Sequence, residues 1–244
     1  MSKAPIISRI HYCVLKFIGF YLGADSTAAT IAYLFYTLAQ PQNIKYQTKI
    51  HEEVSKLSLP YSHKEICNLP YLNTVILEIQ RVYPAGPGSV QQRMTPAGQN
   101  TILSFRGETY SLPPNTQVCI QPYSLHRNVE VFGIDVEIFR PERWQEVDDE
   151  QLQRMRDAWI PFGRGARTCL GMKYAPLYLH KWHFKLTFIQ SLALMEIKYL
   201  AATILRDHVA ELPLANEKVN DMTVQWGAVI RPRAEKCQLT FRKI

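Results

Sequence analysis

The stretch WIPFGRGARTCLG, residues 159 to 171, contains one cysteine among three glycines, two arginines and a phenylalanine. Glycine reaches backbone conformations that side chains exclude, so this composition predicts a shaped loop and not a helix or strand. Arginines beside a thiol favour its deprotonated form. The stretch therefore predicts a thiolate at Cys169 that is presented to an electron-poor partner. The residues alone leave open whether that partner is a metal, a redox partner or an electrophilic substrate.

The composition places this loop in a globular protein. The chain has 244 residues, of which 47% are hydrophobic, enough for one large core or two small ones. Its five cysteines are odd in number and form no CxxC pair, which argues against a disulfide framework or a zinc ribbon. The net charge of +7 comes from scattered basic residues without an aromatic-basic module, so nucleic acid is not an expected partner.

Hydrophobic periodicity, proline and glycine divide the chain into elements. We expect helices over about residues 12–39, 43–57 and 69–84, and a further helix after Cys169. Short strands are expected in SVQQRMT, NTILSFR and TQVCIQ, and again near the end of the chain, around 222–243. The intervening residues 128–168 show little periodicity and are expected to form an ordered coil. The expected fold class is therefore mainly α with small β-sheets.

Residues 17–39 are apolar enough to raise the possibility of a membrane span. Asp25 lies near the middle of this segment, where a carboxylate in lipid costs about 2.5 to 3.5 kcal/mol. We therefore expect a buried helix, with a membrane span as the less favoured alternative. Residues 1–16 have no small-residue cleavage site after a charged and then apolar pattern, so they do not resemble a signal peptide.

Two charged residues interrupt the apolar helix expected over 69–84. Glu78 and Arg81 are three positions apart, which places them on one face within pairing distance. Apolar neighbours on both sides predict that the pair is buried, and a buried pair needs further hydrogen-bonding partners. Arg143, in the FRPERW stretch at 139–144, is the expected additional partner.

Four motifs follow one another along the chain: ExxR at 78–81, YSLHRN at 123–128, VFGIDVEIFRPERW at 131–144 and PFGRGARTCLG at 161–171. In this order they resemble the haem-thiolate monooxygenases, the cytochromes P450, and most of all the fungal members. The cysteine loop fits the family pattern F-x-x-G-x-R-x-C-x-G at every fixed position. The resemblance implies the C-terminal half of the P450 fold, from the distal I helix through the cysteine-ligand loop to the L helix.

The resemblance implies a role for each residue of the opening stretch. Cys169 is expected to be the axial thiolate ligand of the iron in haem, iron protoporphyrin IX. Phe162 is expected to pack beneath the macrocycle, and the loop glycines to let the backbone approach it closely. Arg167 is expected to pair with a haem propionate, as is Arg93, which could equally be an ordinary surface arginine. The implied cofactor-binding set is Cys169, Arg167, Phe162, Gly163, Gly171 and Arg93. Glu78, Arg81 and Arg143 have an implied structural role.

GADST at 23–27 is similar to the family's A/G-G-x-D/E-T-T stretch on the long helix over the haem. The resemblance implies that Asp25 and Ser26 are catalytic and relay protons to iron-bound dioxygen. Family members usually have Thr where this chain has Ser26, so uncoupled turnover to peroxide is a possible consequence. The alternative is that Ser26 and Thr30 bond back to carbonyls of their own helix.

The resemblance covers residues 22–244 and corresponds to the later half of a family member. We expect residues 1–21 to be an unmatched N-terminal segment and 174–191 to be an anomalous insertion within the partial P450 domain. The family helix resembling LALMEI should follow the cysteine loop directly, but here it begins only at about residue 192. Pro176 would break a helix that started at the cysteine.

A retained fungal intron is the favoured explanation of 174–191. Lys173 to Ala175 can be encoded with GTATGC and Leu186-Thr187 with the branch-like CTAAC. Excision ending inside an AGY codon for Ser191 restores the family helix in frame. Transcripts that cross this junction mostly unspliced would refute the intron. They would favour a genuine insertion, whose basic residues could attract an acidic reductase.

Three function classes remain. The first is a monooxygenase that inserts one oxygen atom from O2 into a small apolar or aromatic molecule, with electrons from an NADPH-cytochrome P450 reductase. The second is a truncated, non-catalytic haem-binding remnant, and the third is a membrane-anchored structural fragment. The family implies the endoplasmic reticulum membrane as the location, although this sequence shows no clear anchor.

Overall fold

The computed structural model describes residues 23–86, 92–169, 192–213, 222–225, 229–233 and 237–244. The described residues are mainly helical, with four small antiparallel sheets of two strands each. The expected fold class is therefore confirmed. The proposed break at Pro176 lies outside the described residues.

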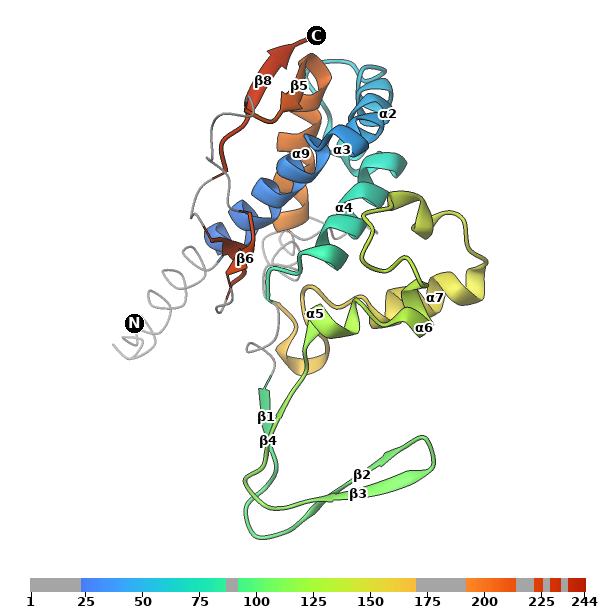
Figure 1. Ribbon diagram of the computed structural model, residues 1–244, viewed down its shortest axis with the longest axis vertical. Coiled ribbons are helices and arrows are strands. Elements are labelled where there is room, and N and C mark those ends of the chain that lie inside the picture. Colours follow the sequence, from blue (N-terminus) through green and yellow to red (C-terminus); the bar gives the residue numbers. More distant parts are fainter. Residues whose placement is uncertain (1–22, 87–91, 170–191, 214–221, 226–228, 234–236) are drawn as a thin grey trace, which may run out of the picture.

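Four long helices form the body of the molecule (Figure 1). The first runs over residues 23–38, and the others are α2 (Ile44–Val54), α4 (Pro70–Val82) and α9 (Leu192–Asp207). The 3-10 helix η1 (Pro41–Asn43) and the short helix α3 (His63–Cys67) lie between them in the sequence. The largest hydrophobic core is formed where these helices pack, and it includes Leu34, Ile50, Leu72, Ile79 and Ala201. The helices predicted over 43–57 and 69–84 are therefore present, each a few residues shorter than expected.

Each sheet pairs two short strands. β1 (Gln92–Met94) pairs with β4 (Gln117–Cys119), and β2 (Thr101–Phe105) pairs with β3 (Glu108–Leu112). Near the C-terminus, β5 (His208–Glu211) pairs with β8 (Thr240–Lys243), and β6 (Val224–Gln225) pairs with β7 (Arg231–Pro232). The β2–β3 hairpin stands away from the helical body, joined to it through β1 and β4 (Figure 1).

Sequence analysis did not identify β3, because the alternation in GETYSL is short. The signal for it lies in the turn before it. Arg106 has φ 51° and Gly107 has φ 81°, and two successive positive φ values are typical of the tight turns that close β-hairpins. A glycine at the second of these positions after the strand TILSF was therefore usable evidence for a hairpin.

Residues 128–168 are more regular than predicted. They contain α6 (Val129–Phe132), η2 (Pro141–Trp144), α7 (Asp149–Ala158) and η3 (Gly165–Arg167), and α5 (Pro122–Leu125) directly precedes them. The prediction of coil was wrong for α7. This helix buries only Met155, and its apolar face is completed by the partly buried Leu152 and Ala158, three apolar residues in a segment that is otherwise charged or amide-bearing. Its start is marked instead by Asp148, whose side chain accepts a hydrogen bond from the Gln151 amide at 2.8 Å.

A second, smaller core packs beside this segment. Phe132, Val136, Trp144 and Met155 are its buried members, and Trp159 lies against them. This core connects the end of α7 to η2, and so it supports the backbone that enters the cysteine loop.

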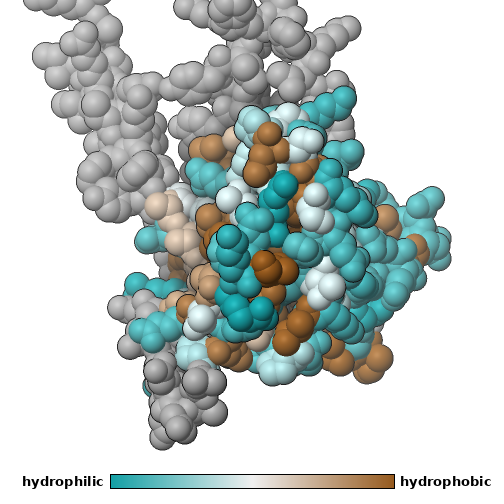
Figure 2. Space-filling view, turned by 90° about the horizontal axis from the view of Figure 1, so that it is seen from above, coloured by the Kyte–Doolittle hydropathy of each residue, from teal (hydrophilic) through white to brown (hydrophobic). Residues whose placement is uncertain are grey.

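In the part of the chain that the structure describes, no helix has the length and hydrophobicity needed to span a bilayer. The face of the molecule seen from above is largely hydrophilic, with small hydrophobic patches separated by polar residues (Figure 2). Scattered apolar side chains of this kind are ordinary on a protein surface.

Candidate functional site

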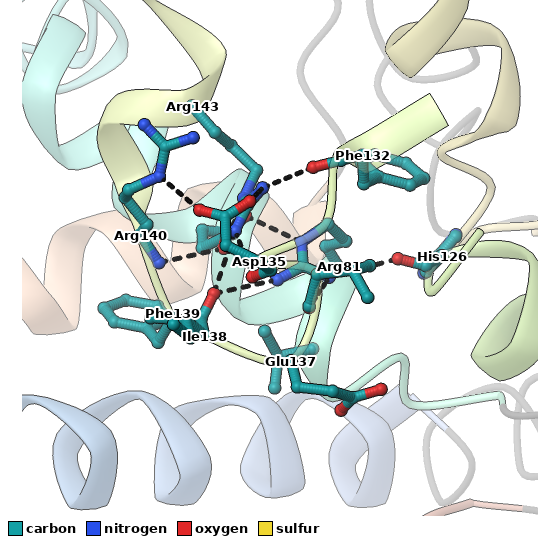
Figure 3. A network of polar contacts seen from close by, with 12 residues as sticks. Arg81, His126, Phe132, Asp135, Glu137, Ile138, Phe139, Arg140 and Arg143 are labelled. Atoms are coloured by element: carbon teal, nitrogen blue, oxygen red, sulfur yellow. Dashed lines mark hydrogen bonds and ion pairs between the residues drawn. The ribbon is translucent and has the colours of Figure 1, made fainter. Parts of the chain in front are cut away.

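The buried carboxylate of Glu78 on α4 belongs to a polar network, of which Figure 3 labels Arg81, Arg140 and Arg143. Oε1 accepts hydrogen bonds from Arg81 Nη2 at 2.8 Å, Arg143 Nε at 3.0 Å and the Arg140 amide at 3.0 Å. Oε2 accepts from Arg81 Nε at 2.9 Å and from the indole Nε1 of Trp144 at 2.9 Å. This one carboxylate therefore fixes η2 against α4.

The two arginines that hold Glu78 use their remaining N–H groups on backbone carbonyls. Arg81 Nη1 donates to the carbonyls of Val136 at 2.7 Å and His126 at 3.1 Å. Arg143 donates to the carbonyls of Phe132, Asp135 and Ile138 at 2.5 to 3.0 Å. Glu78 and Arg81 have 0% exposed side chains and Arg143 has 1%, so their charges depend on these contacts in place of water.

Asp135 brings the second negative charge to the network. Its Oδ1 lies 3.0 Å from Arg143 Nη1, and its Oδ2 lies 2.7 Å from Arg140 Nε. Partial burial by itself would raise the pKa of Asp135, but the hydrogen bonds and charges of Arg143 and Arg140 outweigh burial and hold this pKa below its ordinary value. Two buried arginines, Arg81 and Arg143, therefore face the carboxyl groups of Glu78 and Asp135.

A chain of aromatic contacts leads from the network to the cysteine loop. Trp144 meets Trp159 edge to face with ring centroids 6.4 Å apart, and Trp159 meets Phe162 in the same way at 6.3 Å. The indole Nε1 of Trp159 also donates to the Leu77 carbonyl on α4 at 3.1 Å. The entry to the loop is thereby fixed to the helix that carries Glu78.

His126 makes a second connection to the loop entry. Its Nε2 accepts a hydrogen bond from the Ile160 amide at 2.8 Å, and its side chain is fully buried. Burial lowers the pKa of His126 to about 3, and the positive charges of Arg81 and Arg127 act in the same direction, although backbone carbonyls of Arg81 and Gln80 partly oppose them. The ring is therefore neutral at physiological pH.

The loop itself turns at two glycines. Gly163 has φ 70° and Gly165 has φ 77°, a region that residues with a Cβ rarely adopt. The Cys169 amide donates to the Phe162 carbonyl at 2.8 Å, which closes the loop, and the cysteine is exposed. This geometry holds one accessible thiol on a loop whose entry is fixed and which the Cys169–Phe162 hydrogen bond closes.

The structure describes only part of the other residues that were predicted to bind haem. Gly171 and the side chain of Arg167 lie outside the described part of the structure. Arg93 is exposed on β1, and its Nη1 donates to the carbonyl of its neighbour Gln92 at 2.8 Å. The assignments to haem all remain predictions, for Cys169, Phe162 and Gly163 as well as for Arg93, Arg167 and Gly171.

Asp25 and Ser26 lie in the first described turn of the helix over residues 23–38. Asp25 is exposed, and the Ser26 hydroxyl donates to the Gly23 carbonyl at 3.3 Å. Thr30 donates to the Ser26 carbonyl at 2.9 Å. These two hydrogen bonds are the ones expected if Ser26 and Thr30 bond back to carbonyls of their own helix. They do not test whether Asp25 and Ser26 relay protons.

The donor chemistry of the loop fits haem. Within the described ranges, no cluster of three His, Cys, Asp or Glu side chains could hold a metal ion by itself. Haem iron takes most of its ligands from its macrocycle and would need one from the protein, which the exposed thiol of Cys169 could supply.

Sequence analysis missed several residues that position the loop. Asp135 and Trp159 lie in the quoted sequences but were given no role. Each has a hydrogen-bonding group and lies in a segment rich in proline and aromatic residues. That combination was the signal in the sequence for a side chain with a fixed partner. His126 was quoted within YSLHRN, yet its contact with Ile160 joins residues 34 positions apart and leaves no local pattern.

Comparison with known proteins matches the chain to one family. The family model described as Cytochrome P450 matches residues 9–182. The match extends into both segments that sequence analysis set apart, 1–21 and 174–191, whose assignment as unmatched and inserted segments stays a prediction.

Curated relatives of the chain are fungal. Cytochrome P450 monooxygenase orf2 of Aspergillus niger is 32% identical over 217 residues, which cover 88% of this chain and 38% of that protein. Cytochrome P450 monooxygenase azaI, also of Aspergillus niger, is 30% identical over 237 residues, covering 88% of this chain and 44% of that protein. Cytochrome P450 monooxygenase cfoH of Aspergillus candidus is 34% identical over 170 residues, which cover 65% of this chain and 30% of that protein. The chain thus spans less than half the length of these relatives.

Proposed function

The chain belongs to the cytochrome P450 family, and from this we propose that it is the haem-binding part of a haem-thiolate monooxygenase. Its reaction would insert one oxygen atom of O2 into a small apolar or aromatic substrate. The observation that carries the proposal is the exposed Cys169 on a loop whose glycines have positive φ and whose amide is held by Phe162.

Haem, when bound through Cys169, supplies an electron-rich iron centre that activates dioxygen. The chain's own contribution is to hold the sulfur in place. Gly163 and Gly165 let the backbone turn closely, and the Trp159 contacts with Leu77 and Phe162 fix where the loop begins. Arg167 and Arg93 would bind the propionates by charge-assisted hydrogen bonds, and Gly171 would keep the far side of the loop close to the ring.

Proton delivery is assigned to Asp25 and Ser26. Asp25 is exposed, so its carboxylate can exchange protons with solvent. Ser26 can pass a proton on once its hydroxyl turns away from the Gly23 carbonyl, a bond of 3.3 Å that is weak by its length.

The proposed electron donor is an NADPH-cytochrome P450 reductase, and the proposed location is the endoplasmic reticulum membrane. Both proposals come from the family. The net charge of +7 supports the first, because a basic protein attracts an acidic flavoprotein surface.

A non-catalytic haem-binding remnant is the second candidate. Ile102, Phe105 and Tyr110 on the β2–β3 hairpin are exposed large hydrophobic residues. Exposed hydrophobic residues of this kind mark a surface that another protein segment can cover, and in the remnant that cover would be absent. The cysteine loop could still bind haem in that state without completing a turnover.

Reconstitution of the chain with haemin tests these candidates, with the reduced carbon monoxide difference spectrum as the measurement. Cys169→Ser should abolish the thiolate-type Soret band, whereas Cys119→Ser, which alters another exposed thiol, should leave it unchanged. The band together with product formation supports the monooxygenase, and the band without turnover supports the remnant. A folded chain that takes up no haem overturns both, and if it dissolves only in detergent, the membrane-anchored fragment is favoured.

A further inference from the structure

We propose that His126 is a positioning residue for the Cys169 loop, acting through the Ile160 amide. The proposal rests on the proposed function only in naming Cys169 as the haem ligand. The contacts that carry it are independent of that role.

The first step is the chemistry of the hydrogen bond between His126 and Ile160. A backbone N–H can only donate, so Nε2 of His126 must carry its lone pair, and the ring proton must be on Nδ1. The imidazole is thus assigned to one tautomer, and among the described residues its buried Nδ1 has no hydrogen-bond partner. A side chain without an acceptor at this position would leave the Ile160 amide buried and unpaired.

Two contacts hold His126 in place. The His126 carbonyl accepts from Arg81 Nη1 at 3.1 Å, and its ring lies edge to face against Phe132 with centroids 6.4 Å apart. Arg81 is itself held by Glu78. The position of His126 is therefore set by the buried charge network.

The third step runs from Ile160 to the cysteine. The Ile160 carbonyl accepts from the Gly163 amide at 2.9 Å, and the Phe162 carbonyl accepts from the Cys169 amide at 2.8 Å. A shift of Ile160 would therefore act directly on the turn at Gly163. Through the neighbouring Phe162 it would also act on the hydrogen bond that closes the loop at Cys169. His126 connects the rigid network on α4 to the residue that is expected to bind iron.

Two variants of His126 separate this role from simple core packing. His126→Gln keeps an acceptor at about the position of Nε2, whereas His126→Phe keeps a ring and removes the acceptor. His51→Phe is the control, because His51 Nδ1 lies 3.3 Å from the Leu205 carbonyl, a contact between α2 and α9 and not with the loop.

Amide hydrogen exchange of the haem-free chain is the first measurement. The Ile160 amide should exchange roughly tenfold to a hundredfold faster in His126→Phe than in the wild type, and His126→Gln should recover most of the protection. His51→Phe should not change exchange at Ile160. Equal protection in the wild type and His126→Phe would overturn the proposal.

The second measurement is the share of thiolate-type reduced carbon monoxide complex after haem reconstitution. This share should fall in His126→Phe and recover in His126→Gln. If the wild type binds no haem, the proposed function fails while the exchange result still decides the role of His126. If the wild type gives the thiolate-type complex and all three variants match it, the positioning role fails alone.

Nitrogen NMR of the wild-type chain provides a measurement that needs no variant to fold. It should show His126 protonated at Nδ1 with Nε2 as an acceptor. A ring protonated at Nε2 would overturn the proposal.

Discussion

Oε1 of Glu78 and Nε of Arg143 lie 3.0 Å apart, although 65 positions of sequence separate the two residues. Both side chains are buried, so this contact joins α4 to η2 inside the protein and not on its surface. Removing one partner of such a pair leaves an uncompensated buried charge, which costs far more than losing a surface ion pair.

Glu78→Gln should therefore destabilise the chain strongly. The amide removes the negative charge that two buried arginines face and places an NH2 group among donors. We expect the free energy of unfolding in urea to fall by about 3 to 5 kcal/mol.

Glu142→Gln is the matched control for Glu78→Gln. Glu142 pairs with Lys49 at 2.8 Å, and the Lys49 and Glu142 side chains are 48% and 20% exposed, so water reaches the pair and the expected loss is below about 1 kcal/mol. Similar losses for the two variants would show that burial does not determine the strength of the Glu78 network.

Arg143→Lys tests whether the network requires a guanidinium or only a positive charge. Arg143 donates from three nitrogens to side-chain and backbone oxygens, a geometry that a single ammonium cannot reproduce. We expect a loss of about 2 to 4 kcal/mol by urea unfolding, because at least two buried acceptors lose their partner.

Arg140→Lys is the adjacent control for Arg143→Lys. Arg140 is 38% exposed and its side chain pairs with Asp135 and Glu146, where water can replace a lost contact. Its lysine variant should lose less than about 1 kcal/mol. Equal effects at 140 and 143 would contradict the requirement for a guanidinium at Arg143.

Gly165→Ala tests the backbone of the cysteine loop. A Cβ at Gly165 would meet no atom within 4 Å, so the whole effect comes from φ 77°. We expect a loss of about 1 to 2 kcal/mol, and a smaller loss for Gly165→Asn, because asparagine tolerates this region better. Thermal unfolding monitored by circular dichroism measures both.

Gly23→Ala is the control for Gly165→Ala. Gly23 also has open space around its Cβ position, but it lies in a helix, where alanine is favoured over glycine. The control should be neutral or stabilising. A neutral Gly165→Ala would mean that the loop does not need the left-handed conformation.

The sequence predicted the helices that carry an apolar face and the residues that meet within one helix. Glu78 and Arg81 are three positions apart on α4, so helical geometry brings them together, and PERW offered Arg143 as a donor. The short strand β3 was missed because it buries no alternating set of side chains, and α7 was missed because charged and amide residues outnumber the few apolar ones on its inner face.

The rest of the site depends on contacts that have no sequence period. Trp159 reaches the Leu77 carbonyl across 82 positions, and the His126 ring reaches Ile160 across 34. Each contact is possible only after α4, η2 and the loop entry have packed. Residue type suggested that these side chains would need partners, but only the fold determines which partners they find.

His126 gives the chain a specific dependence on pH. The pKa of an unfolded histidine is about 6.5, and burial lowers that of His126 to about 3 in the folded chain. Between these values the unfolded state binds one more proton than the folded state, so the free energy of unfolding falls as the pH falls, by about 1.4 kcal/mol per pH unit. The lowered pKa of Asp135 acts in the same direction but in a lower range, because its ordinary value is 3.8.

Urea unfolding of the wild type and His126→Gln between pH 7 and pH 5 isolates this contribution. The wild type should lose stability relative to the variant by about 1 to 2 kcal/mol over that interval, because glutamine takes up no proton. The difference between the two proteins cancels the other histidines and the carboxylates. Parallel stability curves would show that His126 is not held neutral in the folded chain. A protonated Nε2 could not accept the hydrogen bond from the Ile160 amide, so this result would also contradict that contact.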